Sequence, residues 1–193
     1  MKQNREINPF GINFDLHSGK GTEKAATKRY LRDMKGMYGD GQAFAQMTET
    51  ENPLVYEFSE LDLPATEGDL LFGTSITYSG KVGEEYFMTK GHFHAILATA
   101  EVYYCLSGQG LLLMENPEGQ WDAQTLLPGR AVYVPQRFAH RTINTGLTPL
   151  VTFFVFRADA GHDYGTIETR GFRKLVIEHN GRVEIVDNPA WHE

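Results

Sequence analysis

The stretch Thr89-Lys90-Gly91-His92-Phe93-His94 decides how the rest of this chain is interpreted. Side chains alternate across a β-strand, so a His-x-His pair on a strand presents both imidazoles on one face. The carboxylate of Glu101 follows a short loop later, and His140 lies downstream of Val134-Pro135. Imidazoles and a carboxylate gathered in one place are typical ligands of a divalent metal. The pattern therefore predicts a metal site formed by His92, His94, Glu101 and His140.

Glu101 strengthens this prediction because its strand is expected to be buried. Tyr103 and Cys105 share its face, and apolar residues occupy the other face as well. A buried carboxylate without a partner is costly, so Glu101 needs a cation or several hydrogen-bond donors. The alternative is a hydrogen-bonded core glutamate beside two structural histidines. The His-x-His pair together with Glu101 and His140 favours the metal.

Three imidazoles and one carboxylate suit one divalent ion per chain, such as iron(II), manganese, nickel, cobalt or zinc. On an octahedral ion, four protein ligands leave two adjacent positions for water or for two neighbouring oxygens of a substrate. The residue pattern does not choose among these metals, because cellular availability usually decides.

Composition excludes several other classes of function. The chain has 193 residues, a size that suits one domain, and its formal net charge is -7. Without a cluster of Lys and Arg, nucleic acid is not expected as a partner. The single cysteine, Cys105, allows no intrachain disulfide. No signal peptide and no membrane span are recognisable, so we expect a cytoplasmic protein without a membrane partner.

The first 53 residues are predicted to contain a strand and two helices packed on a barrel formed by residues 54–193. Phe10–Leu16 alternates like a half-buried strand. Thr22 resembles an N-cap for a helix over 23–35, whose apolar stripe would be Ala26, Tyr30, Leu31 and Met34. A shorter helix is expected over Asp40–Met47.

From Leu54 onward, short β-rich runs recur between Gly, Pro, Asn and Asp, which is typical of an all-β sandwich or barrel. The expected strands are Leu54–Phe58, Asp69–Tyr78, Glu84–Met88, Ala100–Ser107, Gly110–Asn116, Gln120–Leu126, Ala131–Val134, His140–Asn144 and Leu150–Arg157. Asn180-Gly181 predicts a closing hairpin between Phe172–Glu178 and Arg182–Val186. We therefore predict an all-β jelly-roll barrel with a short N-terminal helical segment and a pocket between its sheets.

The sequence resembles the cupin superfamily, and within it the cupin-type phosphoglucose isomerases of archaea and some bacteria. The resemblance covers nearly the whole chain. Its general cupin part is Gly91-His92-Phe93-His94, Glu101, Gly108, Pro128-Gly129, Val134-Pro135 and His140. Its specific part includes Pro9-Phe10-Gly11, Val55-Tyr56-Glu57, Glu67-Gly68-Asp69-Leu70, Gly80-Lys81-Val82-Gly83, Thr89-Lys90, Arg141-Thr142, Asp159-Ala160-Gly161-His162-Asp163-Tyr164-Gly165 and Val186-Asp187-Asn188-Pro189.

The resemblance implies a cupin barrel and a metal, usually iron, on His92, His94, Glu101 and His140. It implies that His162 lies beside the sugar, and we expect a catalytic role for His162 as well as for Glu101. The expected substrate and phosphate contacts are Tyr56, Ser75, Thr89, Lys90, Gly91, Tyr103 and Tyr164. Ser75 stands where relatives have Thr, and Phe156 stands where they have Tyr. On residues alone, the alternative role of Gly91 is to relieve crowding before the metal strand.

These features predict a metal-dependent isomerase that interconverts glucose 6-phosphate and fructose 6-phosphate in glycolysis and gluconeogenesis, and by analogy a homodimer. Glu101 is the natural candidate for the base, although a bound cation weakens a carboxylate as a base. His162, a metal-bound water or a direct hydride shift are the alternatives. A cupin dioxygenase and a non-catalytic phosphosugar-binding cupin are the rival functions.

Overall fold

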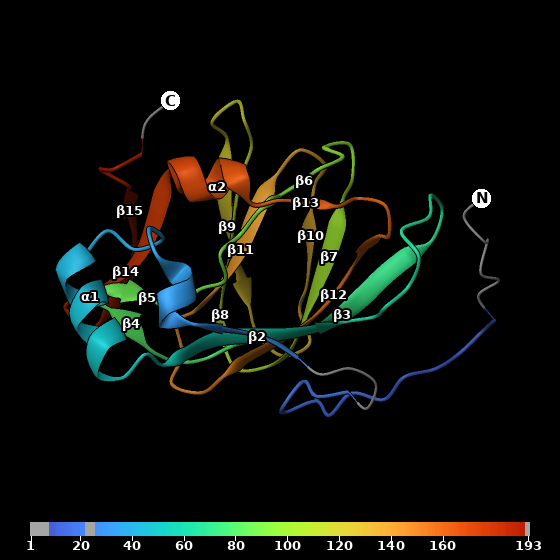
Figure 1. Cartoon of the computed structure of the whole chain (residues 1–193), viewed down its shortest axis with the longest axis horizontal. Helices are drawn as coiled ribbons and strands as arrows, with labels where there is room; N and C mark the ends of the chain where they lie inside the picture. Colours follow the sequence, from blue (N-terminus) through green and yellow to red (C-terminus); the bar gives the residue numbers. More distant parts are fainter. Residues whose placement is uncertain (1–7, 22–25, 192–193) are drawn as a thin grey trace.

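Two antiparallel sheets face each other across the middle of the molecule in the computed structural model, which describes residues 8–21 and 26–191 (Figure 1). The larger sheet has the order β1-β2-β3-β12-β7-β10, and the smaller has the order β11-β8-β9. The strands of the larger sheet are β1 (Thr27–Tyr30), β2 (Leu54–Glu60), β3 (Leu70–Thr77), β12 (Leu150–Arg157), β7 (Glu101–Ser107) and β10 (Ala131–Val134). Those of the smaller are β11 (Ala139–Asn144), β8 (Gly110–Glu115) and β9 (Trp121–Leu126).

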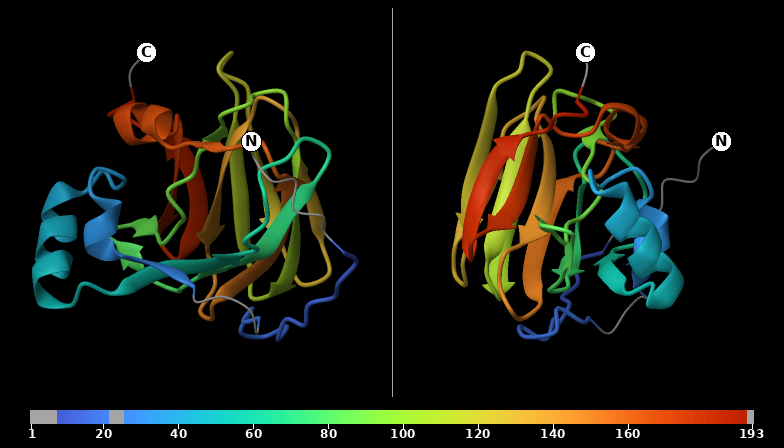
Figure 2. Two further views of the ribbon diagram at one scale, coloured as in Figure 1. Left: turned by 45° about the vertical axis from the view of Figure 1, so that its right-hand side comes forward. Right: turned by 90° about the vertical axis from the view of Figure 1, so that its left-hand side faces the viewer.

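Side chains from both sheets fill the barrel interior. Figure 2 shows the two sheets as layers. Phe154 of β12 and Val132 of β10 belong to one buried cluster with Leu112 of β8 and Leu126 of β9. Along β7, Glu101, Tyr103 and Cys105 are buried, whereas Tyr104 is exposed. This strand therefore buries one face only, not both as expected. The predicted all-β jelly-roll barrel with a short N-terminal helical segment is confirmed.

A second core lies at the end of the barrel that carries α1 (Gly41–Thr50), where several short elements meet (Figure 1). It includes Leu31 and Met34 of the 3-10 helix Leu31–Met34, Val82 and Val176. The elements around it include β4 (Lys81–Val82), β5 (Glu85–Tyr86), β14 (Lys174–His179) and β15 (Arg182–Asp187), which form one sheet in the order β15-β14-β5-β4.

The predicted helix over Asp40–Met47 and the predicted hairpin are both confirmed. The Asp40 side chain accepts a hydrogen bond from the Ala43 backbone N–H and caps α1. Strands β14 and β15 pair from Lys174 to Asp187. Their turn places Asn180 and Gly181 at φ of 52° and 72°, the positive values that a tight Asn-Gly hairpin requires.

The predicted helix over residues 23–35 is wrong. Thr22, the supposed cap, lies outside the described residues. Thr27–Tyr30 instead forms β1, which pairs antiparallel with β2, and only Leu31–Met34 is helical, as a 3-10 turn. Within the supposed apolar stripe, Tyr30 is exposed while Leu31 and Met34 are fully buried. Hydrogen bonding to the edge of a sheet outweighed the local helical spacing, which is a weak preference by comparison.

The predicted strand over Phe10–Leu16 is also wrong. Only Phe14 forms a bridge, to Gly21, and both Phe10 and Leu16 are exposed. The Asp15 carboxylate accepts hydrogen bonds from the backbone N–H groups of His17 and Ser18, which turns the chain before a strand can extend.

The strand expected for the His-x-His pair is present as the short β6 (Phe93–His94). Two short elements near it were not foreseen, namely β13 (His162–Asp163), which pairs with β6, and α2 (Gly165–Arg170). The predicted strand over Glu84–Met88 is reduced to β5. Within the described ranges, no helix is long and apolar enough to cross a bilayer.

We predict that the segment before β2 unfolds together with the barrel. Leu31→Ala removes a fully buried side chain and should lower the free energy of unfolding by about 2–5 kcal/mol. The matched control is Leu147→Ala, since Leu147 is 96% exposed and its truncation should change stability by less than about 0.5 kcal/mol. Chemical denaturation followed by circular dichroism measures both. A separate early transition in Leu31→Ala would contradict a single folding unit.

Candidate metal centre and active site

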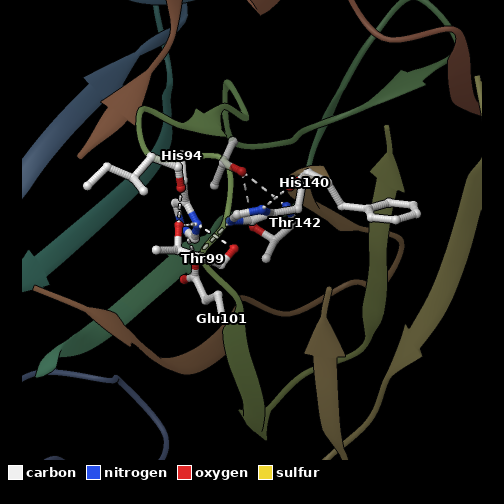
Figure 3. Close-up of polar contacts among 8 residues, drawn as sticks. His94, Thr99, Glu101, His140 and Thr142 are labelled. Carbon is white, nitrogen blue, oxygen red and sulfur yellow. Dashed lines mark hydrogen bonds and ion pairs between the residues drawn. The ribbon is translucent and has the colours of Figure 1, made fainter. Parts of the chain in front are cut away.

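Four side chains from three parts of the barrel converge on one point. His92 precedes β6, His94 lies on β6, Glu101 begins β7 and His140 lies on β11. Their candidate ligand atoms all lie within 4.8 Å of one another. His94 Nε2 is 3.1 Å and His140 Nε2 is 2.9 Å from the same oxygen, Glu101 Oε2 (Figure 3). The structure thus brings together the four residues that the sequence pattern grouped.

Backbone pairing fixes two of these histidines against each other. His92 and His140 form an antiparallel bridge in which each backbone N–H donates to the other residue's carbonyl, at 3.3 Å and 3.2 Å. His94 is held in a different way, because β6 pairs with β13 and places His94 opposite His162. The ligands are therefore carried by paired strands rather than by free loops.

Hydrogen bonds at the far side of two rings set their tautomers. The Thr99 hydroxyl donates to the Ile96 carbonyl, so its contact of 2.8 Å with His94 Nδ1 requires Nδ1–H as the donor. His140 Nδ1 likewise lies 3.3 Å from the Phe138 carbonyl, which can only accept. Both rings consequently turn an unprotonated Nε2 toward Glu101, the state in which imidazole binds a metal.

The Glu101 carboxyl is ionised although it is 3% exposed. Burial alone would raise its pKa, but the charge of His140 and hydrogen bonds from His140 and His94, when these rings are also protonated at Nε2, outweigh burial and hold the pKa far below its usual range. A bound cation would take the place of those Nε2 protons. Burial lowers the pKa of His92, and His140 and His162 lower it further. The centre thus combines a carboxylate with a neutral imidazole, as metal coordination requires.

The donor set fits a divalent metal by a direct structural criterion. The buried atoms His92 Nε2 and His140 Nε2 have no hydrogen-bond partner within the described parts of the chain. Buried polar atoms are almost always satisfied, so unsatisfied ones require an explanation. Two unpartnered imidazole nitrogens beside an ionised carboxylate are explained by a cation that all of them share.

The centre opens into a cavity of about 500 Å³, a volume that includes space open to solvent. With the exception of His94, every predicted site residue contributes to its wall. The lining residues are Tyr56, Phe58, Glu60, Ser75, Thr89, Lys90, Gly91, His92, Glu101, Tyr103, His140, Phe154, Phe156, His162 and Tyr164.

The Thr89–Gly91 segment, here named the phosphate loop for its predicted role, is held against β11. Thr89 N–H donates to the Thr142 carbonyl at 2.9 Å, and Thr142 N–H donates to Thr89 Oγ1 at 3.1 Å. Thr89 Oγ1 accepts hydrogen bonds and donates none among the described residues, so its hydroxyl proton can serve an anion. Gly91 has φ +75°, and a Cβ there would lie 2.7 Å from the Phe172 ring and 2.9 Å from the His140 carbonyl. Crowding alone therefore requires glycine at this position.

The phenols around the cavity are hydrogen-bond donors at neutral pH. Burial raises the pKa of Tyr56, and raises that of Tyr164 to about 12. Burial, followed by the charge of Glu101, raises the pKa of Tyr103 well above its usual value. All three hydroxyls keep their protons and can donate to an anion or a sugar.

Lys90 lines the cavity but already has a partner. Its Nζ lies 2.7 Å from Glu168 Oε1 of α2. This ion pair ties α2, and with it the adjacent Tyr164 and β13, to the phosphate loop. The segment Asp159–Gly165 is thus held in place by strand pairing, and its His162 ring lies 4.4 Å from the His92 ring, between centroids.

Comparison with known proteins agrees with these features. The model of the family Glucose-6-phosphate isomerase (GPI) matches residues 28–192. The chain is 48% identical over 185 residues to the glucose-6-phosphate isomerase of Pyrococcus furiosus, covering 95% of this chain and 97% of the relative. It is 47% identical over 183 residues to that of Thermococcus litoralis, covering 95% and 96%. The chain belongs to the glucose-6-phosphate isomerase family.

Other matches have lower sequence identity. A putative glucose-6-phosphate isomerase 1 of Rhizobium meliloti is 41% identical over 192 residues, which covers 95% of this chain and 87% of the relative. Among solved structures, an oxalate decarboxylase of Lactobacillus farciminis in complex with formate matches at a TM-score of 0.46 and 17% identity. The match covers 56% of this chain and 30% of that chain.

Three cavity residues were missed by sequence reasoning. Phe58 and Glu60 follow Tyr56 at two-residue intervals on β2, and Phe154 precedes Phe156 by two on β12. The period of a strand places such residues on the same face. Counting in steps of two residues from Tyr56 and from Phe156 along their strands would have identified all three.

Phe156 lines the cavity and packs between two histidines. Its ring is stacked with the His94 ring at 5.7 Å and lies edge-on to the His162 ring at 5.3 Å, between centroids. Phe156 thus gives this wall of the cavity an aromatic ring without a hydroxyl group.

We predict close to one divalent ion per purified chain, and a loss of metal affinity of more than about 100-fold in His140→Ala. The reason is that this change removes one imidazole and unpairs the Glu101 oxygen 2.9 Å away. Elemental analysis and competition with a chelator measure the affinity. The matched control is His179→Ala, because His179 is exposed at the C-terminal hairpin. Unchanged metal content in His140→Ala would contradict the site.

The lowered pKa of His92 and Glu101 also predicts how the metal responds to acid. Protons compete with the metal for ligands, so a lowered pKa lets a ligand keep the metal to a lower pH. Metal should therefore remain bound at the usual imidazole pKa of about 6.5 and leave only at lower pH. Equilibrium dialysis at pH values above and below 6.5 tests this expectation. Release of half the metal above pH 6.5 would contradict it.

Proposed function

We propose that the chain is a metal-dependent isomerase that interconverts glucose 6-phosphate and fructose 6-phosphate in glycolysis and gluconeogenesis. The single observation that carries this proposal is the shape of one cavity. Its wall holds both a His/Glu metal cluster and a loop with a free hydroxyl proton, in a chain of the glucose-6-phosphate isomerase family. A phosphosugar has a reactive end and a phosphate end, and these two parts of the wall match them.

At the reactive end, a divalent metal, which we propose to be iron(II), would polarise the C1 and C2 oxygens of the sugar and stabilise negative charge that develops on them. His92, His94, Glu101 and His140 would hold it. Manganese, nickel, cobalt and zinc suit the same ligands.

Glu101 is our first candidate for moving the proton between C1 and C2. Its carboxyl is ionised, and the imidazoles of His94 and His140 contact the same oxygen, Oε2. Oε1 is therefore the oxygen that we assign to the substrate proton, which reduces the objection that metal binding weakens a carboxylate as a base.

His162 is our second catalytic residue. It faces the His92 ring across the cavity, and desolvation lowers its pKa, so the ring is neutral at neutral pH. A neutral imidazole can accept a proton at one nitrogen and donate at the other. We assign His162 to proton exchange at the sugar oxygens, beside Tyr103.

At the phosphate end, the assigned contacts are Tyr56, Ser75, Thr89, Lys90, Gly91 and Tyr164. Neutral hydroxyls supply the hydrogen bonds, and Lys90 supplies a charge that it must share with Glu168. Binding energy at this remote group can be used at the reacting carbons.

The assembly and the cellular context extend the proposal. We infer a homodimer in the cytoplasm whose partner molecule is the phosphosugar rather than nucleic acid, consistent with a net charge of -7. Light scattering of the purified protein tests the dimer. A coupled assay for fructose 6-phosphate formation tests the reaction against the rival dioxygenase, which would consume oxygen, and against a sugar-binding module, which would not equilibrate the two sugars.

We predict that Glu101→Gln lowers kcat by roughly 10²- to 10⁴-fold, the usual contribution of a positioned base. The amide keeps an oxygen for the metal but removes basicity, so most of the metal should remain. Metal content must be measured alongside the rate. Near-normal activity in metal-loaded Glu101→Gln would leave Glu101 as a ligand only.

The same proton transfer predicts an isotope result. Isomerisation in deuterated water should place deuterium at the transferred position, because a base that exchanges with water passes solvent hydrogen to the carbon. Mass spectrometry of the product measures the label. Its complete absence would favour a hydride shift or an efficient internal return.

We predict that Thr89→Ala lowers kcat/KM for glucose 6-phosphate by roughly 10-fold or more, since it removes one hydrogen bond to a charged group. Thr89→Ser, which keeps the hydroxyl, is the matched control and should stay close to the parent. Unphosphorylated glucose should be a poor substrate for every variant. Equal kcat/KM for glucose and glucose 6-phosphate in the parent protein would remove the phosphate role.

A further inference from the structure

Arg141 is a buried cation that the proposed chemistry does not use. It lies on β11 between His140 and Thr142, and its residue is 3% exposed. Alternation along the strand turns it away from the face shared by its two neighbours. It is not among the residues that line the cavity. Its guanidinium lies over the Phe172 ring, 4.0 Å from the ring centre, inside the second core.

The contacts of this guanidinium do not neutralise its charge. One terminal nitrogen donates to the Lys90 carbonyl at 2.6 Å, the other contacts Met88 Sδ at 2.9 Å, and Nε has no partner among the described residues. The charges of Glu85 and Glu115 act on the guanidinium, but within the described ranges neither carboxylate forms an ion pair with it. Glu85 accepts from the Gly39 N–H, and Glu115 accepts from Arg173.

A buried charge without a counter-ion is costly, and a guanidinium cannot escape the cost by losing its proton. Within the described ranges, Arg141 forms no ion pair with a carboxylate, which makes it a candidate for a role that needs an anion to be present. Its strongest hydrogen bond points to where that anion would be, since Lys90 belongs to the phosphate loop.

The peptide between Lys90 and Gly91 connects Arg141 to the cavity. In a trans peptide the carbonyl and the following N–H point in opposite directions, and the described chain has no cis peptide. Because the Lys90 carbonyl points to Arg141, the Gly91 N–H points away from Arg141, and Gly91 lines the cavity. This N–H donates to no atom of the described residues, although Gly91 is buried. Unpaired buried N–H groups are rare, so it has room for a ligand acceptor.

We propose that Arg141 is a positioning residue for the substrate's phosphate. Its guanidinium holds the Lys90–Gly91 peptide so that the Gly91 N–H faces the phosphate, and the phosphate dianion is the counter-ion that the buried charge lacks. The proposal rests on the function proposed above. It adds a residue that acts through the loop, from the opposite side of β11 to the metal.

The test compares Arg141→Met with Arg141→Lys, using inorganic phosphate as the probe for binding and glucose 6-phosphate as the substrate. In Arg141→Met, the Ki of inorganic phosphate and the KM for glucose 6-phosphate should rise about 10- to 100-fold, as expected for loss of one charge acting across a low-dielectric gap. The kcat should change by less than about threefold, and metal content should not change, because the reactive end is untouched. Arg141→Lys keeps the charge and should recover part of the phosphate affinity.

Arg173→Met is the matched control. Arg173 also lies over an aromatic ring, 4.3 Å from the centre of Trp191, and also donates to backbone carbonyls, but it does not contact the phosphate loop. Its replacement should leave the Ki of phosphate within about twofold of the parent, the usual size of an effect without a specific contact.

Each of three outcomes would overturn the proposal. Arg141→Met and Arg173→Met could lose equal phosphate affinity, or Arg141→Met could keep the affinity of the parent. Arg141→Lys could also bind phosphate no more tightly than Arg141→Met. If Arg141→Met does not fold, the unmodified protein still gives the answer in its zinc-loaded form. Addition of inorganic phosphate should shift the Gly91 amide and Arg141 Nε–H resonances with one Kd, and an unmoved Gly91 amide would overturn it. A parent protein that binds phosphate in this way but does not isomerise the sugar would refute the proposed function alone.

Discussion

The pairing of β11 with the segment Thr89–His92 is the constraint on which the site depends. Reciprocal hydrogen bonds join His92 to His140 and Thr89 to Thr142. One short ladder thus sets the distance between the metal cluster and the phosphate loop. A sugar phosphate is a molecule of fixed length, so this distance determines whether its two ends can be held at once. Gly91 makes the ladder possible, because any Cβ there would collide with the His140 carbonyl.

The charges of the metal-cluster residues depend on their burial away from water. Removing Glu101 from solvent penalises its charge, and only a positive charge beside it offsets the penalty, either protons on Nε2 of His94 and His140 or a bound cation. The same burial keeps the imidazole of His92 neutral. An arrangement of one anion and several lone pairs directed at a common centre is complementary to a cation. In the absence of a cation, it would be an unfavourable way to build a core.

Much of this site could be predicted from local sequence, because its signals have the period of a strand. The His-x-His pair and the Glu101 strand depend on alternation, and the described strands obey it. The helix predicted over 23–35 failed because the edge of β2 lies far away in sequence, and single-chain periodicity contains no information about such partners. The same limit hid β13, whose existence depends on pairing with β6. It also hid the proposed role of Arg141, whose contacts come from two separate segments, at Met88 and Lys90 and at Phe172.

The two cations near the phosphate loop differ in how they can serve an anion. Lys90 is partly exposed and its partner Glu168 is more exposed still, so salt screens the attraction between them. Exchanging Glu168 for a phosphate as the partner of Lys90 therefore costs little free energy. Arg141 is buried, cannot move to solvent and has no carboxylate to release. Its field acts at short range through one polarised peptide, where water does not screen it. The mobile charge of Lys90 is therefore suited to capturing the phosphate, while the fixed charge of Arg141 is suited to discriminating a dianion from a neutral sugar once it is bound.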